Sequence, residues 1–151
     1  FPSNTPFLAF EGSSGTTKIT VITFGKDQIY GTGVDNVGTV PSSLATYLAL
    51  AKSGYDMVIN AGTCGGFQRK GLKIGSVVLT RGVANHDRRI PIPGFDTFGI
   101  GKLETLDPSK MAKALGFETG ICTTGNSLDK VEKDDELMLS NDASVKDMEA
   151  G

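Results

Sequence analysis

Residues Ile59–Phe67, Ile-Asn-Ala-Gly-Thr-Cys-Gly-Gly-Phe, combine several glycines with a single hydroxyl, that of Thr63. They follow a short apolar run and open into a Gly-Gly loop. A buried strand presents backbone N–H groups and a small polar side chain to a ligand at its carboxyl end in this way. The hydroxyl of Thr63 could therefore donate to an anion or to a reactive water. For Thr63 taken alone, a hydroxyl that caps a tight turn is the simpler interpretation.

A second pair with chemical potential is Met148-Glu149, which follows a short strand expected at Ala143–Asp147. The methionine could pack against the face of a sugar, and the carboxylate could accept hydrogen bonds from two vicinal hydroxyls. Each such charge-assisted bond contributes roughly 1.5–3 kcal/mol. Without further context, a surface glutamate after a core methionine explains the same two residues.

The thiols and the one histidine give a weaker pattern. Cys64 and His86 invite a Cys–His hydrolase interpretation, but nothing in the sequence brings the two together. His86 lies in a polar loop, followed directly by Asp87-Arg88-Arg89. Cys122 lies in an apolar strand and is predicted to be part of the core.

Metal and cofactor sites are not indicated. One histidine without clustered carboxylates leaves no zinc site. The acidic run Asp134-Asp135-Glu136 lacks the ligand spacing of an EF-hand and is expected to be a solvated first helical turn, where it suits the helix dipole. Gly31-Thr32-Gly33 lacks the third glycine of a dinucleotide fingerprint. We therefore expect no metal and no cofactor.

Composition narrows the class of protein further. At 151 residues the chain has the length of one domain. Its 17 acidic and 15 basic residues nearly cancel, so charge gives no reason to expect nucleic acid or a membrane surface as a partner. No apolar run approaches the roughly 18 residues that span a bilayer. The two cysteines lack disulfide-framework or metal spacing, which indicates a reducing compartment, and we expect the cytoplasm.

The residues that could do chemistry must be positioned by alternating strands and helices. Helices are predicted after Thr39, over Pro108–Leu115 and over Lys133–Ser140. The alternation favours an open α/β sheet with helices on both faces. Strands are predicted at Lys18–Phe24, Met57–Ala61, Val77–Thr80, Gly120–Thr124 and Ala143–Asp147.

Local details make these predictions specific. The first helix should end at Gly54, and the second should be capped by Asp107 and closed by Gly116. The stretch Ala84–Leu103 carries prolines and glycines without a period and is expected to be a functional or interface loop. One face of the first helix is predicted to hold Leu44, Tyr47, Leu48 and Ala51.

Five ordered segments resemble the nucleoside phosphorylase superfamily, and more narrowly the plant-type branch of the 5′-methylthioadenosine/S-adenosylhomocysteine nucleosidases. The resemblance implies an α/β fold of three αβα layers with a central mixed twisted sheet, in a single domain over residues 1–151. The segments are Gly33–Pro41, Ile59–Phe67, His86–Pro93, Thr124–Asp129 and Asn141–Glu149.

The resemblance implies hydrolysis of the N-glycosidic bond of 5′-methylthioadenosine to adenine and methylthioribose, in methionine salvage. S-Adenosylhomocysteine is left open as a second substrate. The transition state is expected to be cation-like at the ribose, so a carboxylate near the hydroxyls would help and the departing base would need a proton. A homodimer without cofactor is implied, with the loop His86–Pro93 at the dimer contact and beside the alkylthio end of a neighbouring pocket.

The resemblance also implies roles for single residues. Glu149 would bind the ribose 2′- and 3′-hydroxyls, and Met148 would pack against the sugar. Thr63 would lie where nucleosidases hold the attacking water and phosphorylases hold phosphate. Leu128 would present backbone groups and an apolar surface to adenine, where some relatives have an aromatic residue. The substrate-binding set is Thr63, Leu128, Lys146, Asp147, Met148 and Glu149.

Two catalytic groups of the family have no counterpart in these residues. Its water-activating glutamate would precede Phe1, and the aspartate that protonates adenine would follow Gly151. We therefore expect a partial domain without the first strand and the C-terminal strand and helix, and expect this chain to be inactive by itself.

Two other functions stay open. The first is a purine nucleoside or methylthioadenosine phosphorylase of the same superfamily. The lack of a basic residue within Gly62–Gly66 disfavours it, although Arg88 could be supplied from another loop. The second is a non-catalytic storage or nucleoside-binding protein on the same fold, which would have no need of the Met148-Glu149 pair. Fold alone does not separate these functions.

Overall fold

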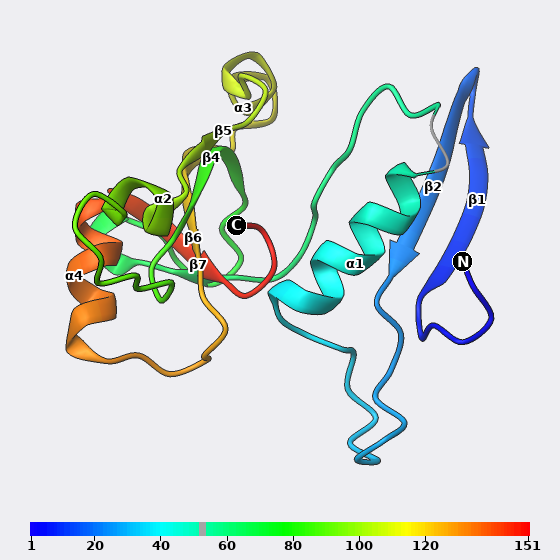
Figure 1. Cartoon of the computed structure of the whole chain (residues 1–151). Helices are drawn as coiled ribbons and strands as arrows, with labels where there is room; N and C mark the ends of the chain where they lie inside the picture. Colours follow the sequence, from blue (N-terminus) through cyan, green and yellow to red (C-terminus); the bar gives the residue numbers. More distant parts are fainter. Residues whose placement is uncertain (52–53) are drawn as a thin grey trace. The chain divides into compact units, whose positions relative to one another are not determined.

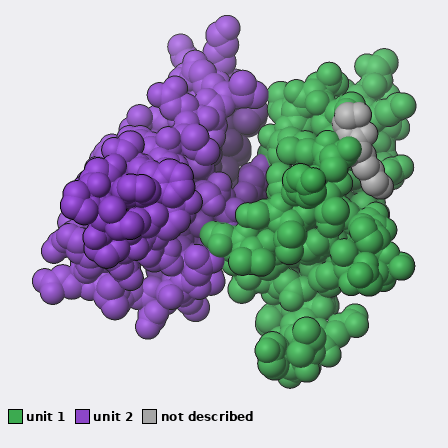
Figure 2. Space-filling view, in the orientation of Figure 1, with its two compact units in different colours: residues 1–59 green, residues 60–151 purple. Residues whose placement is uncertain are grey.

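The computed structural model describes residues 1–51 and 54–151 and divides into two compact units, residues 1–59 and 60–151 (Figure 2). Each unit has its own β-sheet. The mixed α/β architecture that the sequence predicts is confirmed. The expectation of a single domain over residues 1–151 stays a prediction.

The first unit contains a β-hairpin and a helix. Strands β1 (Leu8–Ser14) and β2 (Thr17–Thr23) are antiparallel and pair Leu8 with Thr23 (Figure 1). The predicted strand at Lys18–Phe24 is therefore confirmed as β2. Its partner β1 was missed because strand alternation is weak in Leu8–Ser14, where Gly12, Ser13 and Ser14 follow one another.

The helix of the first unit, α1 (Thr39–Leu50), confirms the predicted helix but not its buried face. The side chains of Leu44 and Tyr47 are 51% and 71% exposed, whereas the buried residues are Ser42, Ala45 and Ala49. Small residues allow close approach of the backbone, and the larger apolar side chains lie on the open side. The helix ends before the predicted stop at Gly54, and Ala51 is its C-terminal cap.

The glycine-containing segment at residues 31–33 is folded around an aspartate. The carboxylate of Asp27 accepts the backbone N–H of Tyr30 at 3.0 Å and both the N–H and the hydroxyl of Thr32. These hydrogen bonds, led by that of Tyr30, lower the pKa of Asp27 to about 2. The Gly-Thr-Gly segment thus forms a surface turn of the first unit.

The second unit is built on a five-stranded sheet in the order β3-β7-β6-β4-β5 (Figure 1). Strands β4, β6 and β7 are parallel to one another, while β3 and β5 pair antiparallel at the two edges. The sheet is therefore mixed, as predicted. Its strands are β3 (Gly65–Gly66), β4 (Val78–Asn85), β5 (Leu103–Glu104), β6 (Glu118–Thr124) and β7 (Ala143–Asp147).

Three predicted strands are confirmed and one is wrong. The predictions at Val77–Thr80, Gly120–Thr124 and Ala143–Asp147 correspond to β4, β6 and β7. Residues 57–61 form no strand, and Met57 and Ile59 are 60% and 77% exposed. A parallel strand is stable only when neighbouring strands take up its N–H and C=O groups, and no described strand pairs with this apolar run.

The helices of the second unit follow the predicted signals closely. Helix α3 (Ser109–Leu115) begins where Asp107 Oδ1 accepts the N–H of Ser109 at 3.0 Å, and it ends at Gly116 in the left-handed conformation. The N-cap is Pro108, so Asp107 lies one residue before the predicted cap position. Its contacts with Ser109, led by that of the hydroxyl, lower the pKa of Asp107. Helix α4 (Glu132–Ser140) confirms the predicted third helix. The stretch 84–103 is less irregular than predicted, because it contains helix α2 (Asp96–Ile100).

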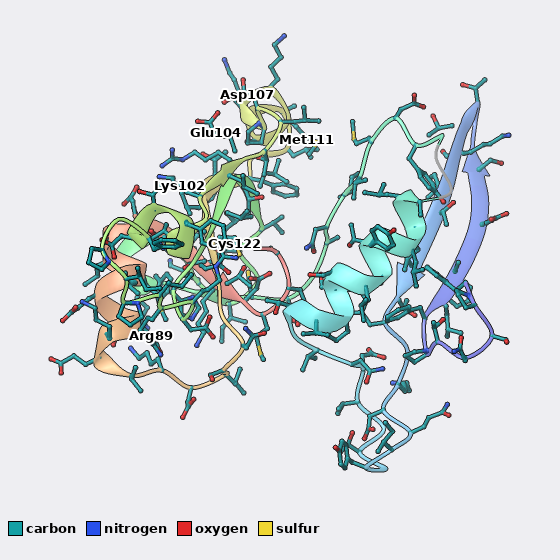
Figure 3. The ribbon with its side chains drawn as sticks, in the orientation of Figure 1. Arg89, Lys102, Glu104, Asp107, Met111 and Cys122 are labelled. Atoms are coloured by element: carbon teal, nitrogen blue, oxygen red, sulfur yellow. The ribbon has the colours of Figure 1, made fainter. Side chains whose placement is uncertain are left out.

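The core of the second unit lies against the central strands. Leu72, Cys122 and Val145 form a buried cluster, and Val78 and Val83 pack against it. Cys122, on the central strand β6, is labelled in Figure 3. It is 3% exposed, which confirms its predicted place in the core. This packing holds β6 and β7 in the register that positions their carboxyl ends.

No helix among the described residues is long and apolar enough to be a membrane-spanning candidate.

Candidate functional site

The carboxyl ends of three parallel strands meet at one edge of the sheet. Asn85 of β4 pairs with Thr124 of β6, and Thr124 pairs with Asp147 of β7. Open α/β sheets bind ligands outside the carboxyl ends of their parallel strands. The segment after β7 therefore emerges at the place where this architecture builds sites.

The glycine-rich turn reaches the same edge through β3. Gly65 pairs antiparallel with Lys146, so the residues before Gly65 run toward the end of β7. Cys64, directly before Gly65, lies close enough to Asp147 for that carboxylate to act on its thiol. Thr63 is exposed. The pairing of β3 with β7 thus brings together two of the segments that the sequence singled out separately.

Asp147 organises the turn that follows β7. Its Oδ1 accepts the hydroxyl of Thr124 at 2.5 Å, and its Oδ2 accepts the N–H of Ala150 at 2.9 Å. The carboxylate is therefore engaged by the protein itself on both oxygens. Asp147 thus shapes the backbone that carries Met148 and Glu149, and its predicted contact with substrate stays a prediction.

Met148 and Glu149 lie within that turn and are both half-buried. The N–H of Met148 donates to Glu149 Oε2 at 3.2 Å. This contact folds the carboxylate back toward the end of β7 instead of leaving it extended in solvent. A carboxylate held here, with an apolar neighbour, has the chemistry of a clamp for vicinal hydroxyls.

Leu128 lies in the loop 125–130, which connects β6 to α4. Its side chain is 85% exposed, and its carbonyl oxygen accepts a hydrogen bond from Lys146 Nζ at 2.9 Å. Lys146 thus contacts the loop, and its position on β7 places the loop beside the Met148-Glu149 turn. The structure brings Leu128 and Lys146 together, as two members of the predicted set.

The two ends of the loop 125–130 are fixed by charged residues. Asp87 Oδ2 accepts the N–H of Asn126 at 2.5 Å. At the other end, Asp134 Oδ2 accepts the N–H of Val131 at 3.0 Å and its Oδ1 pairs with Arg89. Arg89 is labelled beside α4 in Figure 3.

The expectation that the acidic run is a solvated first turn is wrong for Asp134. Its side chain is only 6% exposed. Burial by itself would raise the pKa of Asp134, but the Val131 N–H and the Arg89 guanidinium outweigh it and hold the pKa below its usual value. Asp135 and Glu136 pair with Lys130 and Lys133 at the surface. Helical periodicity turns one residue of an acidic run inward, and composition alone does not show which.

His86 lies buried between β4 and the loop 125–130. Its Nδ1 is 3.2 Å from Thr123 Oγ1, and its side chain is among the most buried in the chain. Burial, assisted by the ammonium of Lys146, lowers the pKa of His86 below 6.5. A Cβ at Gly125 would collide with the imidazole ring, so glycine is needed at the start of the loop.

Thiol chemistry is disfavoured by the surroundings of Cys64. Burial and the carboxylate of Asp147 raise the pKa of the Cys64 thiol, which is opposite to what a thiolate nucleophile needs. His86 interacts with Thr123 instead of Cys64. Burial raises the pKa of Cys122 still more strongly, as expected of a core thiol.

The guanidinium of Arg88 is bonded to two backbone carbonyls of helix α2. Arg88 donates from Nε to the Gly99 carbonyl at 3.1 Å and from its terminal nitrogen to the Phe98 carbonyl at 2.5 Å. Its hydrogen bonds therefore stabilise the position of α2.

Across residues 1–51 and 54–151, no three histidine, cysteine or acidic side chains gather as metal ligands.

Sequence reasoning missed three side chains that build this site: Asp87, Thr124 and Asp134. Each lies within or beside a segment whose composition suggested a role, yet each acts through a partner 23 to 45 residues away. The available signal was the family resemblance of the segments that contain Asp87 and Thr124. No spacing rule could have named their partners.

The comparisons with known proteins agree with this geometry. Residues 1–151 match the profile of the phosphorylase superfamily over the whole chain. The chain belongs to the phosphorylase superfamily. Within it, the chain is 43% identical over 144 residues to an Arabidopsis thaliana 5′-methylthioadenosine nucleosidase, covering 95% of this chain. It is 42% identical over 149 residues to an Arabidopsis 5′-methylthioadenosine/S-adenosylhomocysteine nucleosidase, covering 99% of this chain.

Solved structures of the superfamily share the fold. The apo structure of Arabidopsis 5′-methylthioadenosine nucleosidase matches 97% of this chain with a TM-score of 0.91 at 42% identity. That match covers 59% of the solved chain, and the two curated relatives are covered over 53% and 58% of their lengths. The chain therefore spans somewhat more than half the length of these superfamily members.

Proposed function

We propose that this chain forms the nucleoside-binding part of an N-ribosyl hydrolase that cleaves 5′-methylthioadenosine to adenine and methylthioribose. The observation that carries the proposal is the β3–β7 pairing, which brings the Thr63 turn to the Met148-Glu149 turn at the carboxyl edge of the sheet. The names of the similar Arabidopsis proteins support the substrate. Acceptance of S-adenosylhomocysteine belongs to the same proposal and is supported by the second of them.

The proposed chemistry divides between the segments at this edge. Glu149 would accept hydrogen bonds from the ribose hydroxyls and stabilise positive charge that develops on the sugar as the base departs. Thr63, exposed on the facing turn, would orient the attacking water. The loop that carries Leu128 would bind adenine. We further propose a homodimer that acts in methionine salvage in the cytoplasm.

The general acid and base are not assigned to any residue of this chain. Two carboxylates at the carboxyl edge, Asp147 and Asp87, accept backbone N–H groups of the segments around them, and Glu149 is given the ribose contact. We propose that these two groups come from flanking segments of the longer family fold. The activity of the 151 residues alone should then be far below that of an extended polypeptide.

The test is adenine release from 5′-methylthioadenosine, with and without inorganic phosphate. It uses the 151-residue chain beside a polypeptide extended to the length of the matched relatives. We expect the extended polypeptide to release adenine equally in both conditions. Release only with phosphate would replace the proposal by a phosphorylase. Nucleoside binding by a folded extended polypeptide without any release would favour a binding or storage protein instead.

A further inference from the structure

We propose that Lys146 is a positioning residue that fixes the loop 125–130 relative to the Met148-Glu149 turn. This inference rests on the proposed function, because it concerns how the base and the sugar of one nucleoside are held at once. It assigns Lys146 an action through the loop backbone, in place of direct contact with substrate.

The contact itself is specific. Lys146 Nζ donates to the carbonyl oxygens of Leu128 and Asp129, at 2.9 Å each. An ammonium group has three donors and no acceptor, so two consecutive carbonyls are well matched to it. The lysine reaches across 18 residues of sequence to Leu128. Its contacts are with the backbone, so they hold the loop whatever side chain occupies position 128.

The loop needs such a contact at its middle. The Leu128 side chain is 85% exposed, so its packing contributes little to holding the loop. The contacts at the two ends are those of Asp87 with Asn126 and of Asp134 with Val131. Between these anchors, Lys146 provides hydrogen bonds from the strand that lies beside the loop.

The position of Lys146 on β7 gives the contact its consequence. Lys146 also pairs through its backbone with Gly65 of β3, and Asp147 follows it directly. Its side chain therefore ties the loop to the strand that continues into Met148 and Glu149. A nucleoside bound between the loop and Glu149 would meet two surfaces whose separation this lysine sets. Loss of the contact would let the two surfaces shift apart and weaken binding of the nucleoside that spans them.

The experiment compares Lys146→Met with the matched control Lys133→Met in the extended polypeptide. Methionine keeps the length of the side chain and removes the charge and all donors. Lys133 is exposed and forms an ion pair with its helical neighbour Glu136. For Lys146→Met we expect KM for 5′-methylthioadenosine to rise about tenfold with a smaller change in kcat, which indicates lost binding. Lys133→Met should change neither constant.

Two further readouts separate positioning from a general loss of structure. Amide exchange of residues 126–130 without ligand should accelerate in Lys146→Met, while exchange in β6 stays unchanged. His86 is the one histidine of the 151-residue chain, so in Lys146→Met of that chain its imidazole titration is followed by NMR without overlap. Removing the nearby ammonium should raise the pKa of His86.

The outcomes decide between the alternatives. If amide exchange of residues 126–130 is unchanged in Lys146→Met, the positioning role is overturned. Faster exchange with an unchanged KM would overturn it as well. Absence of adenine release by the wild-type polypeptide would overturn the proposed function, while the exchange result would still decide whether Lys146 holds the loop. If Lys146→Met does not fold, Lys146→Ala replaces it. Alanine also removes the charge and all donors, so a folded Lys146→Ala with unaltered KM and loop exchange would likewise contradict the proposal.

Discussion

At the scale of single residues, the carboxylates around the end of β7 differ in how they are used. Asp147 is bonded on both oxygens by Thr124 and Ala150. Glu149 is half-buried, and its carboxylate accepts the N–H of the adjacent Met148. The two carboxylates therefore play different structural parts in this turn, and ribose binding by Glu149 stays the proposal that the next experiment tests.

Replacing Glu149 by glutamine tests this assignment. The substitution removes the charge with little change in volume, so kcat/KM of the extended polypeptide should fall at least about tenfold, or about 1.4 kcal/mol. Steady-state kinetics with 5′-methylthioadenosine provides the measurement. Glu136→Gln is the control, because Glu136 is an exposed partner of Lys133 on α4. An unchanged kcat/KM for Glu149→Gln would remove Glu149 from the site.

At the scale of elements, the junction of β4 with β6 holds a buried imidazole whose protonation the fold opposes. Asp87, Asp134, Arg89 and Lys146 all act on His86, but burial is the leading influence and lowers its pKa below 6.5. The unfolded chain therefore takes up this proton at a higher pH than the folded chain. The free energy of unfolding should fall as the pH drops from 6.5 toward the folded-state pKa.

Thermal unfolding between pH 7.5 and 5 measures this effect. We expect the melting temperature to decrease on acidification. The free energy of unfolding should fall by no more than about 1.4 kcal/mol per pH unit, since one group titrates. His86→Gln should flatten the curve in this window. The carboxylates with lowered pKa values, such as Asp134, begin from 3.8 and act at lower pH. A slope that persists in His86→Gln would show that another group causes it.

At the scale of the whole molecule, residues 57–59 expose three consecutive apolar side chains. Met57, Val58 and Ile59 are 60%, 60% and 77% exposed, although the sequence predicts a buried strand here. A contiguous run of exposed apolar side chains is unusual on a protein surface that contacts only solvent. A segment of this kind is suited to pairing with another strand.

Hydrogen exchange of the 151-residue chain examines this segment directly. Amides of residues 57–61 should exchange at least about a hundredfold faster than those of β6, because they have no strand partner among the described residues. In the extended polypeptide we expect the same amides to become protected. Slow exchange of residues 57–61 in the 151-residue chain would mean that they already form the predicted strand.

Local rules in the sequence determined most elements and the family. The β-branched runs, the Asp107 cap and Gly116 predict β2, β6, β7 and α3, because each depends on neighbours within a few residues. The ordered segments identify the superfamily and name Thr63 and Glu149. Only the tertiary structure decided which face of α1 is buried, that Asp134 lies inside, and that residues 57–61 are unpaired. It also decided that Asp147 bonds to Thr124 and Ala150, and that Lys146 donates to the Leu128 and Asp129 carbonyls. These outcomes depend on partners distant in sequence, and the identity of such partners is a property of packing and strand register that local pattern does not contain.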